Sequence, residues 1–342
     1  MQKYNIVKDN MYNAWPDIAI TDSGTLLCVF TECAHHMDRS NSAIVLVKSY
    51  DGGKTWTKKE RISEVSLDGK EHFNNARIQR LKNGEIIILC DRLPDLHGSL
   101  AKAQTYIWNG GKDGESWSKP HPLDIWGIVP DHMLELESGR LIVAAHYVNE
   151  NTKKVTQYAY ISDDDMLTWR QVIVASDLRF DLCEASIIEV EPNVLVALMR
   201  ENSGMGYDCK KSISRDGGLT WEGVYDMPIP GCHRPVAGFL SDGTVLISYR
   251  FLQGGCGGFG STFQNAFLAI TTKEDLLEPE RKKQRARIYP LDYDRSPKAD
   301  TGYTGWIEIS PNKIYVVNYI VDDWTSAQIR GYLVDKKDII LE

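Results

Sequence analysis

Ser49-Tyr-Asp-Gly-Gly-Lys-Thr-Trp56 is an octapeptide that recurs along this chain and decides its fold class. It returns as Ser214-Arg-Asp-Gly-Gly-Leu-Thr-Trp221. A third copy, Ser162-Asp-Asp-Asp-Met-Leu-Thr-Trp169, keeps the Ser, Asp, Thr and Trp, and a degenerate fourth copy ends in Asp113-Gly-Glu-Ser-Trp117. The final tryptophans of successive copies lie 61, 52 and 52 residues apart, a spacing in the range of one β-propeller blade.

The octapeptide has the composition of a tight turn between two strands. Its Asp can accept backbone N–H bonds, and its glycines can adopt positive φ angles. Its Trp can pack the hairpin against a neighbouring layer. We therefore interpret the copies as structural elements rather than as substrate contacts.

Six strand-rich units surround these copies. In the first unit, apolar runs at 17–22, 25–31 and 42–48 precede the octapeptide, and a polar strand near 57–62 follows it. The last unit is one strand short, and the N-terminal strand 2–7 can complete it, which closes the ring and removes two sheet edges. We expect one all-β domain over residues 1–342, a six-bladed β-propeller with blades at approximately 8–62, 75–124, 131–175, 184–227, 234–289 and 302–342.

Composition and charge exclude several classes of protein. A net charge of −8 disfavours nucleic acid and anionic membranes as partners. The seven cysteines include no CxxC pair, which suits neither a disulfide framework nor a zinc site. No export signal opens the sequence, so we expect a cytoplasmic protein, or a secreted or periplasmic one if a signal preceded this sequence. Nothing favours a particular oligomeric state, and no nucleotide or metal motif is present, so we expect no cofactor and no metal.

Three sequence features resemble the sialidase superfamily, whose six-bladed propellers carry the same repeated octapeptide. Glu184 opens the strand Cys-Glu-Ala-Ser-Ile-Ile, and Arg200 closes the next one, Ala-Leu-Met-Arg. Tyr303, in Thr-Gly-Tyr-Thr-Gly-Trp, opens the last unit, and Asp38 lies in the loop before the first octapeptide. The resemblance implies that Tyr303 is the nucleophile, Glu184 its base and Asp38 the acid/base. A Tyr nucleophile departs from the usual pair of carboxylates in glycosidases.

The sequence departs from the sialidase pattern at the first arginine of the carboxylate-binding clamp. Where the family has Arg-Ile-Pro, this chain has Ala14-Trp15-Pro16. The third clamp arginine matches either Arg234 or Arg250. Because guanidinium groups bind carboxylates in a matching fork, we expect weak binding of ordinary sialic acid.

Propeller geometry independently predicts a ring of polar side chains around the channel mouth, where innermost strands begin and second strands end. The positions there include Asp91 and His146, for which the sequence suggests no role. A ring of charge is costly to bury unless it has a function. The residues we expect to bind substrate are Arg77, Asp131, His132, Arg200, His233, Arg234 and Arg250.

These observations favour an exo-acting glycoside hydrolase that removes a terminal sugar, expected to be acidic, from a carbohydrate partner. One alternative is a lyase acting on a uronic-acid-containing glycan, with His132, His233 or Tyr303 as the base. A second is an exo-arabinanase-like retaining enzyme that pairs Glu184 with Glu201 or Asp131. A glycan-binding propeller without catalysis is the third.

Overall fold

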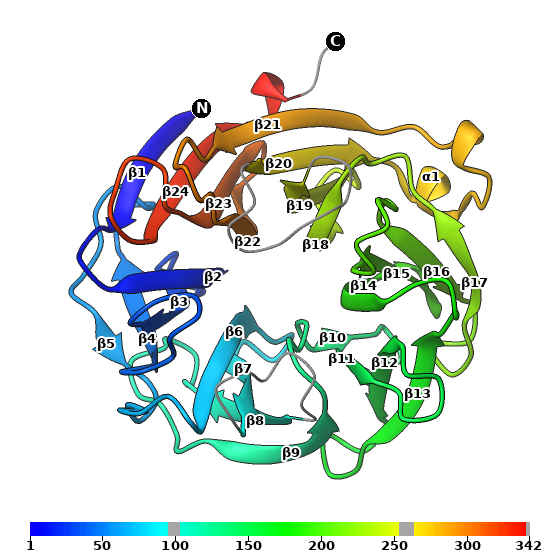
Figure 1. Ribbon diagram of the computed structural model, residues 1–342, viewed down its shortest axis with the longest axis horizontal. Coiled ribbons are helices and arrows are strands. Elements are labelled where there is room, and N and C mark those ends of the chain that lie inside the picture. Colours follow the sequence, from blue (N-terminus) through cyan, green and yellow to red (C-terminus); the bar gives the residue numbers. More distant parts are fainter. Residues whose placement is uncertain (95–102, 253–262, 340–342) are drawn as a thin grey trace.

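The computed structural model describes residues 1–94, 103–252 and 263–339, which form six four-stranded antiparallel sheets around a central channel (Figure 1). We number the sheets as blades 1 to 6. Blade 1 contains β2 (Tyr12–Ile20), β3 (Leu26–Cys33), β4 (Ala43–Ser49) and β5 (Glu60–Arg61). Blade 2 contains β6 (His72–Arg80), β7 (Ile86–Leu93), β8 (Gln104–Asn109) and β9 (His121–Trp126). Blade 3 contains β10 (Leu134–Glu135), β11 (Leu141–Val148), β12 (Val155–Ser162) and β13 (Arg170–Ala175).

The second half of the ring repeats this order. Blade 4 contains β14 (Leu182–Glu191), β15 (Val194–Glu201), β16 (Lys210–Ser214) and β17 (Glu222–Asp226). Blade 5 contains β18 (Cys232–Phe239), β19 (Val245–Leu252), β20 (Gln264–Thr271) and β21 (Arg287–Tyr293). Blade 6 contains β22 (Thr301–Ser310), β23 (Lys313–Ile320), β24 (Gln328–Asp335) and β1 (Gln2–Val7). The predicted six-bladed propeller is confirmed.

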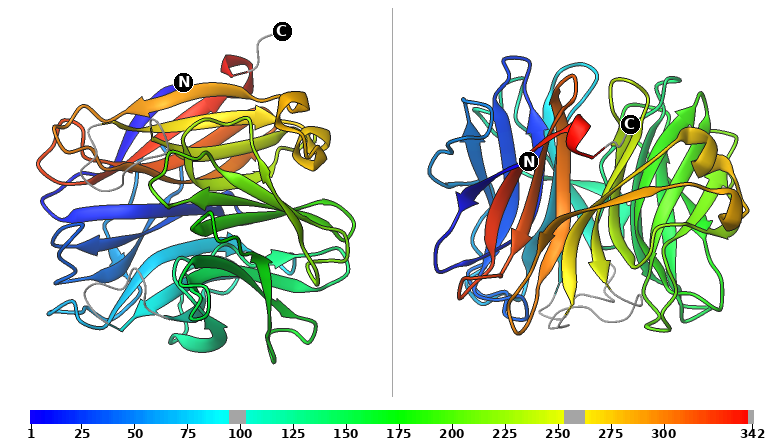
Figure 2. Two further views of the ribbon diagram at one scale, coloured as in Figure 1. Left: turned by 45° about the vertical axis from the view of Figure 1, so that its right-hand side comes forward. Right: turned by 90° about the horizontal axis from the view of Figure 1, so that it is seen from above.

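The hydrophobic core lies between neighbouring blades. All eight residues of β3 are buried, because a blade packs against another blade on both faces and its middle strands read as nearly continuous apolar runs. One core cluster joins Phe30 of blade 1 to Tyr315 and Val317 of blade 6. The views in Figure 2 show the blades standing side by side around the ring.

The recurring octapeptides form hydrogen-bonded turns between the third and fourth strands. In the first copy, Asp51 Oδ1 accepts the backbone N–H of Thr55 at 2.9 Å, and Ser49 Oγ accepts that of Gly53 at 2.9 Å. The Trp56 indole donates to the carbonyl of Gly53 at 3.1 Å. The copies at 162–169 and 214–221 have the same Asp-to-Thr and Ser-to-backbone bonds.

Each octapeptide turn also packs against the preceding blade. The hydroxyl of Tyr315 in blade 6 donates to the carbonyl of Gly53 at 2.7 Å, and a Cβ at Gly53 would lie 2.1 Å from the Tyr315 ring. A Cβ at Gly218 of blade 4 would likewise lie 2.9 Å from the Ile142 side chain of blade 3. The motif therefore joins blades as well as strands.

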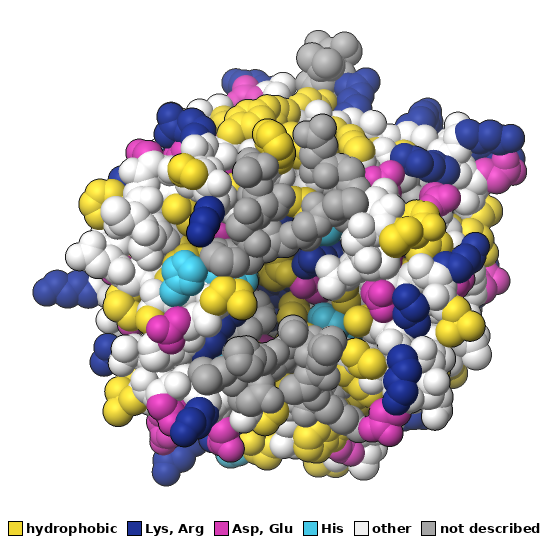
Figure 3. Space-filling model, in the orientation of Figure 1, with side chains coloured by type: hydrophobic (Ala, Val, Ile, Leu, Met, Phe, Trp, Pro, Cys, Tyr) yellow, Lys and Arg dark blue, Asp and Glu magenta, His cyan; other side chains and the backbone are white. Residues whose placement is uncertain are grey.

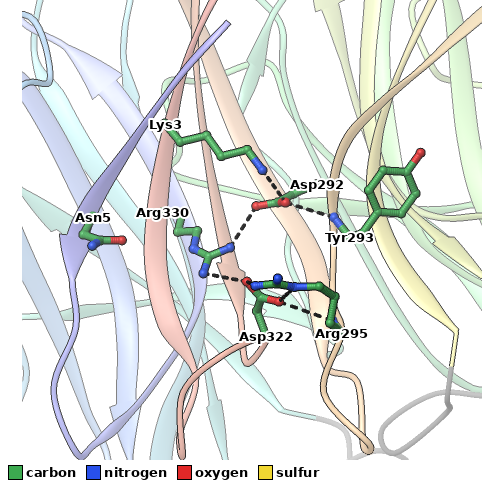
Figure 4. A pocket seen from close by; sticks show the side chains of 7 residues that line it. All are labelled: Lys3, Asn5, Asp292, Tyr293, Arg295, Asp322 and Arg330. Carbon is green, nitrogen blue, oxygen red and sulfur yellow. Dashed lines mark hydrogen bonds and ion pairs between the residues drawn. The ribbon is translucent and has the colours of Figure 1, made fainter.

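The N-terminal strand closes the ring. β1 pairs antiparallel with β24, with Gln2 opposite Leu333. Beside this pair lies a charged pocket of about 490 Å³, in which Lys3 and Arg330 reach Asp292 of blade 5, at 2.6 and 3.1 Å (Figure 4). Asp322 lies between Arg330 and Arg295. These ion pairs connect the closing blade to blade 5.

In the described part of the chain, the single α-helix lies in the connection after β20. α1 covers Lys273–Leu277, and a 3₁₀ turn follows at Arg281–Lys283, while a second 3₁₀ turn, Lys336–Asp338, follows β24. No helix among the described residues is long and apolar enough to cross a membrane.

Candidate active site

The start of each innermost strand carries the same backbone irregularity. One residue there has a positive φ in every blade, between 48° and 95°, and five of the six strands show a β-bulge at this point. Positive φ is costly for a residue with a side chain, and bulges re-aim side chains beside active sites. The six residues are Trp15, Asn75, Val129, Glu184, Arg234 and Gly302.

Glu184, Arg200 and Tyr303 meet in one hydrogen-bonded cluster, although 119 residues separate Glu184 from Tyr303. The Tyr303 hydroxyl donates to Oε1 of Glu184. Arg200 Nη1 donates to both carboxylate oxygens of Glu184 and to the Tyr303 hydroxyl, each at 3.1 Å. All three side chains are buried, so a phenol and a carboxylate are held together by one guanidinium.

The charges of this cluster fix where its proton lies. Burial alone would raise the pKa of Glu184, but the charges of Arg200 and Arg234 outweigh burial and lower it to about 2. Burial and the charge of Glu184 raise the pKa of Tyr303 above its usual value. The resting proton is therefore on Tyr303, and the phenol becomes a nucleophile when that proton passes to Glu184.

Arg234 of β18 is fully buried, and none of its three guanidinium nitrogens has a hydrogen-bond acceptor among the described residues. Its guanidinium carbon lies 5.9 Å from the ring centre of Tyr303. Leaving a buried charge without a hydrogen-bonding partner costs several kcal/mol, so such groups are rare in proteins. A guanidinium in this environment is well suited to binding an anion.

Arg77 of β6 adds a second buried guanidinium near Arg234. Its Nη1 lies 3.5 Å from the carbonyl oxygen of Thr304 and 3.6 Å from Oδ1 of Asp17, and its Nε has no hydrogen-bond partner among the described residues. Burial and the charge of Arg234 lower the pKa of Arg77 to about 10. The two arginines therefore add positive charge near Tyr303.

Arg250 of β19 lies against the Tyr303 ring, with its guanidinium carbon 4.4 Å from the ring centre. Its Nε donates to the carbonyl of Thr301 at 2.8 Å, and its Nη2 donates to the hydroxyl of Tyr319 at 3.0 Å. Arg250 therefore has hydrogen-bond acceptors within the protein, in contrast to Arg234.

The face of the ring drawn in Figure 3 is hollowed at its centre, where basic, acidic and histidine side chains are visible between the segments that are not described. In the described ranges, no three His, Cys, Asp or Glu side chains are grouped so that they could hold a metal ion.

A family model described as a BNR repeat-like domain matches residues 68–252, more than half of the chain. The chain belongs to the BNR repeat-like domain family. Together with the fold, this match confirms the resemblance to the sialidase superfamily. No curated protein matches the chain.

Solved structures share the fold of this BNR propeller. A protein of unknown function from Dyadobacter fermentans has a TM-score of 0.77 at 23% identity, with 98% of each chain covered. The NanB sialidase of Streptococcus pneumoniae has a TM-score of 0.71 at 16% identity, covering 98% of this chain and 70% of that one. The Hadza microbial sialidase Hz136 has a TM-score of 0.71 at 17% identity, covering 96% and 66%. At these identities the likeness establishes the fold and leaves the activity to be argued from the site.

The contacts above bring together six of the predicted site residues, and His132 adjoins them through Asp17, which it shares with Arg77. The six are Arg77, Glu184, Arg200, Arg234, Arg250 and Tyr303. His132 Nε2 lies 2.6 Å from Asp17, whose charge outweighs burial and raises the pKa of His132. Asp131 Oδ2 accepts the backbone N–H of Ile187 in the next blade at 3.1 Å, which is a structural contact. His233 is buried on β18.

Asp38, the predicted acid/base, lies in an exposed turn between β3 and β4. Its Oδ1 accepts the backbone N–H of Ser40 at 2.9 Å, and that bond lowers the pKa of the carboxyl group. Within the described ranges, no hydrogen bond or ion pair connects its carboxylate to Glu184, Arg200 or Tyr303. The carboxylate of Asp38 is therefore engaged within its own turn rather than with the cluster.

The missing clamp arginine is not replaced from the same strand. Ala14 is fully buried in the core between blades 1 and 6. Trp15 takes the positive-φ position, and the guanidinium of Arg39 stacks 4.0 Å above its ring. The start of β2 therefore presents an indole where the sialidase pattern has a cation.

Two further buried residues, His146 and Asp91, were predicted to lie at the channel mouth, but the sequence suggested no role for them. The Nδ1 of His146 accepts the backbone N–H of Glu184 at 3.2 Å, and burial lowers the pKa of His146 to about 4, so the ring is neutral and positions Glu184. Asp91 accepts the backbone N–H of Val129 at 3.1 Å, and burial raises its pKa to about 7. Like Arg200, both residues lie near the end of the second strand of their blade, and this position was the sequence feature that could have indicated a role at the site.

Proposed function

We propose that this BNR propeller is an exo-acting glycoside hydrolase that removes a terminal acidic sugar from a glycan. The observation that carries the proposal is the buried cluster of Tyr303, Glu184 and Arg200, in which a phenol donates to a carboxylate. Beside this cluster, Arg234 has three guanidinium nitrogens without a hydrogen-bond acceptor in the described part of the chain. A nucleophile and an anion-binding group thus occupy one site.

The proposed reaction has two steps that retain the configuration of the sugar. In the first, the Tyr303 oxygen attacks the anomeric carbon, its proton passes to Glu184, and the glycosidic bond breaks as the leaving oxygen is protonated. In the second, a water molecule gives a proton to the group that protonated the leaving oxygen and attacks the same carbon, the Tyr303–sugar bond breaks, and Glu184 returns its proton to Tyr303. Tyrosine suits a sugar with a carboxylate at the anomeric centre, because a neutral nucleophile avoids repulsion between two negative charges.

Binding of an acidic substrate would also make the Glu184 carboxylate a stronger base. Arg200 and Arg234 hold the pKa of Glu184 near 2, which makes its carboxylate a weak acceptor of the Tyr303 proton. A substrate anion bound to Arg234 would offset part of that positive charge and raise the basicity of Glu184. A neutral sugar has no such effect, so the site favours acidic substrates in the chemical step as well as in binding.

The acidic sugar is proposed to differ from ordinary sialic acid. Removing one partner of a buried charged contact costs on the order of 2–5 kcal/mol in affinity, and Ala14-Trp15 provides no cation at the start of β2. The nearby Arg39 guanidinium of blade 1 is stacked on the Trp15 ring rather than carried by β2, so we expect a carboxylate oriented toward β2 to be bound weakly. Sialosides should be poor substrates compared with glycosides whose acidic group can reach Arg234.

The alternative mechanisms have less support from the contacts. A lyase needs a base, and the charge of Asp17 raises the pKa of His132, which makes its protonated form more favourable and its ring a poorer base. An arabinanase-like mechanism needs a second free carboxylate, but Glu201 accepts the backbone N–H groups of Asp181 and Ser203 at 2.9 and 3.0 Å. Its other candidate, Asp131, is bound to the next blade.

The test is a panel of sialosides, uronosides, arabinosides and rhamnosides, assayed with the wild-type protein and with the Glu184→Gln and Tyr303→Phe variants. We expect hydrolysis of an acidic glycoside other than sialosides, with turnover reduced at least 100-fold in both variants. Efficient hydrolysis of sialosides would contradict the substrate. Full activity in Tyr303→Phe, or an unsaturated product absorbing in the ultraviolet, would contradict the mechanism.

A further inference from the structure

A second buried carboxylate, Asp300, lies next to the Tyr303 cluster and is the centre of its own hydrogen-bond network. The hydroxyl of Tyr12 donates to its Oδ2, and the hydroxyl of Tyr319 donates to its Oδ1 at 2.7 Å. His36 Nδ1 lies 2.5 Å from Oδ2. Arg250 Nη2 lies 3.8 Å from Oδ1. Three proton donors from different strands and loops therefore converge on one carboxylate.

This network is continuous with the proposed nucleophile. Asp300 lies directly before β22, three residues before Tyr303. The rings of Tyr303 and Tyr319 lie 6.3 Å apart, edge to face, and Arg250 contacts both of them. His36 belongs to the loop between β3 and β4 that precedes the first octapeptide. The network therefore joins this loop to the Tyr303 side of the channel.

His36 is the member of the network that reaches the surface. Its side chain is 19% exposed, whereas those of Asp300 and Arg250 are 0% and 3% exposed. Its ring packs edge-on against Trp15, with ring centres 5.3 Å apart. An imidazole held at Nδ1 by a buried carboxylate has its tautomer and orientation fixed, which leaves Nε2 as the site of proton exchange.

We propose that His36, oriented by Asp300, is the catalytic acid and base of this enzyme, in place of Asp38. The assignment rests on the proposed glycosidase function. His36 lies two residues from Asp38 in the same loop, but its ring is fixed by a buried partner, whereas the Asp38 carboxylate is bound to Ser40 within its own exposed turn.

The proton steps balance as follows. As the Tyr303 oxygen bonds to the anomeric carbon, the glycosidic bond breaks, and the Nε2 proton of the His36 imidazolium passes to the leaving oxygen. The neutral ring keeps its Nδ1 proton on the hydrogen bond to Asp300. In the second step Nε2 takes a proton from the attacking water, the Tyr303–sugar bond breaks, and the imidazolium is restored.

The charges that face His36 set the pH range of the reaction. Burial lowers the pKa of His36, Asp300 counteracts this by favouring the imidazolium, and the cations Arg39 and Arg250 lower the pKa further. The rings of Tyr12 and Trp15 also pack against His36. Because the first step needs the imidazolium, kcat/KM should fall as the pH rises through a value below the usual 6.5.

The experiment compares the wild-type protein, His36→Gln and the matched control His35→Gln, in the same loop, on an alkyl glycoside and a nitrophenyl glycoside of the preferred sugar. For His36→Gln we expect kcat/KM on the alkyl glycoside to fall about 10²–10⁴-fold, the range of general acid catalysis. On the nitrophenyl glycoside it should fall about tenfold or less, since that leaving group needs little protonation. The alkaline limb of the pH profile should disappear, and on the nitrophenyl glycoside added azide should restore turnover, because azide attacks the covalently bound sugar in place of water without needing a base.

The outcomes separate this assignment from the proposed function. Hydrolysis by the wild-type protein, with an unchanged alkaline limb and equal losses on both glycosides in His36→Gln, would overturn the assignment alone. The expected losses appearing in Asp38→Asn and not in His36→Gln would also overturn it. If the wild-type protein hydrolyses no glycoside, the proposed function and the assignment both fail. The thermal midpoint of His36→Gln, compared with that of His35→Gln, shows whether a loss reflects unfolding.

Discussion

Replacing Arg234 by methionine should make the protein more stable while it abolishes binding of acidic ligands. The three guanidinium nitrogens of Arg234 are buried without an acceptor in the described ranges, and an apolar side chain of similar volume avoids the desolvation penalty of a buried ion, which amounts to several kcal/mol. The variant does lose the attraction between Arg234 and Glu184, but Glu184 keeps its hydrogen bonds to Arg200 and Tyr303. We therefore expect the free energy of unfolding to rise by about 1–3 kcal/mol.

The assay is urea unfolding of Arg234→Met beside Arg200→Met, the same substitution in the neighbouring blade. Arg200→Met should destabilise the protein by about 3–5 kcal/mol, because it leaves the carboxylate of Glu184 buried without its charged partner. An acidic sugar should raise the thermal midpoint of the wild-type protein and leave that of Arg234→Met unchanged. If the two variants are destabilised equally, Arg234 has a partner in the free protein and our account of the anion site is wrong.

Three further predictions concern the ring and its charges. Gly53→Ala should destabilise the protein by about 1–3 kcal/mol more than Gly52→Ala, because a Cβ at Gly53 overlaps a ring while one at Gly52 meets nothing within 4 Å; equal unfolding energies would contradict this. The pKa of Glu184 falls from 4.5 to about 2 on folding. Its ionisation therefore contributes about 3 kcal/mol to the free energy of unfolding, which is fully present above pH 4.5 and is lost as the pH falls toward 2. In Glu184→Gln, the free energy of unfolding should not show this decrease between pH 4.5 and pH 2. Asp292→Asn should speed amide exchange in residues 2–7, because Asp292 binds Lys3; unchanged exchange would show that strand pairing alone closes the ring.

The sequence predicted the fold because blades 1 to 4 repeat the octapeptide turn and the strands of every blade repeat apolar runs. Octapeptides such as 49–56 fix the turn between the third and fourth strands, and apolar runs such as 26–33 fix the buried strands. The ring also explains why Glu184 and Tyr303 could be assigned to one site from their place in the blade. Repetition converts a position within a blade into a position around the channel.

The sequence could not predict the partners of individual side chains. Asp38 fits the family pattern, but its carboxylate is bound within its own turn to Ser40. The pairing of His36 with Asp300 joins residues 264 apart and depends on how blades 1 and 6 meet. Arg234 and Arg250 could not be distinguished as clamp residues, because only the structure shows which guanidinium already has acceptors.

The most direct test of the central claim is the mass of the Tyr303 peptide after reaction with a fluorinated acidic sugar that bears a good leaving group. Fluorine slows the second step, so the sugar should remain covalently bound to the enzyme. The account predicts that the peptide containing Tyr303 gains the mass of one sugar in the wild-type protein and that Tyr303→Phe gains none. Turnover of the parent glycoside without a sugar on Tyr303, or an adduct on any other residue, would contradict it.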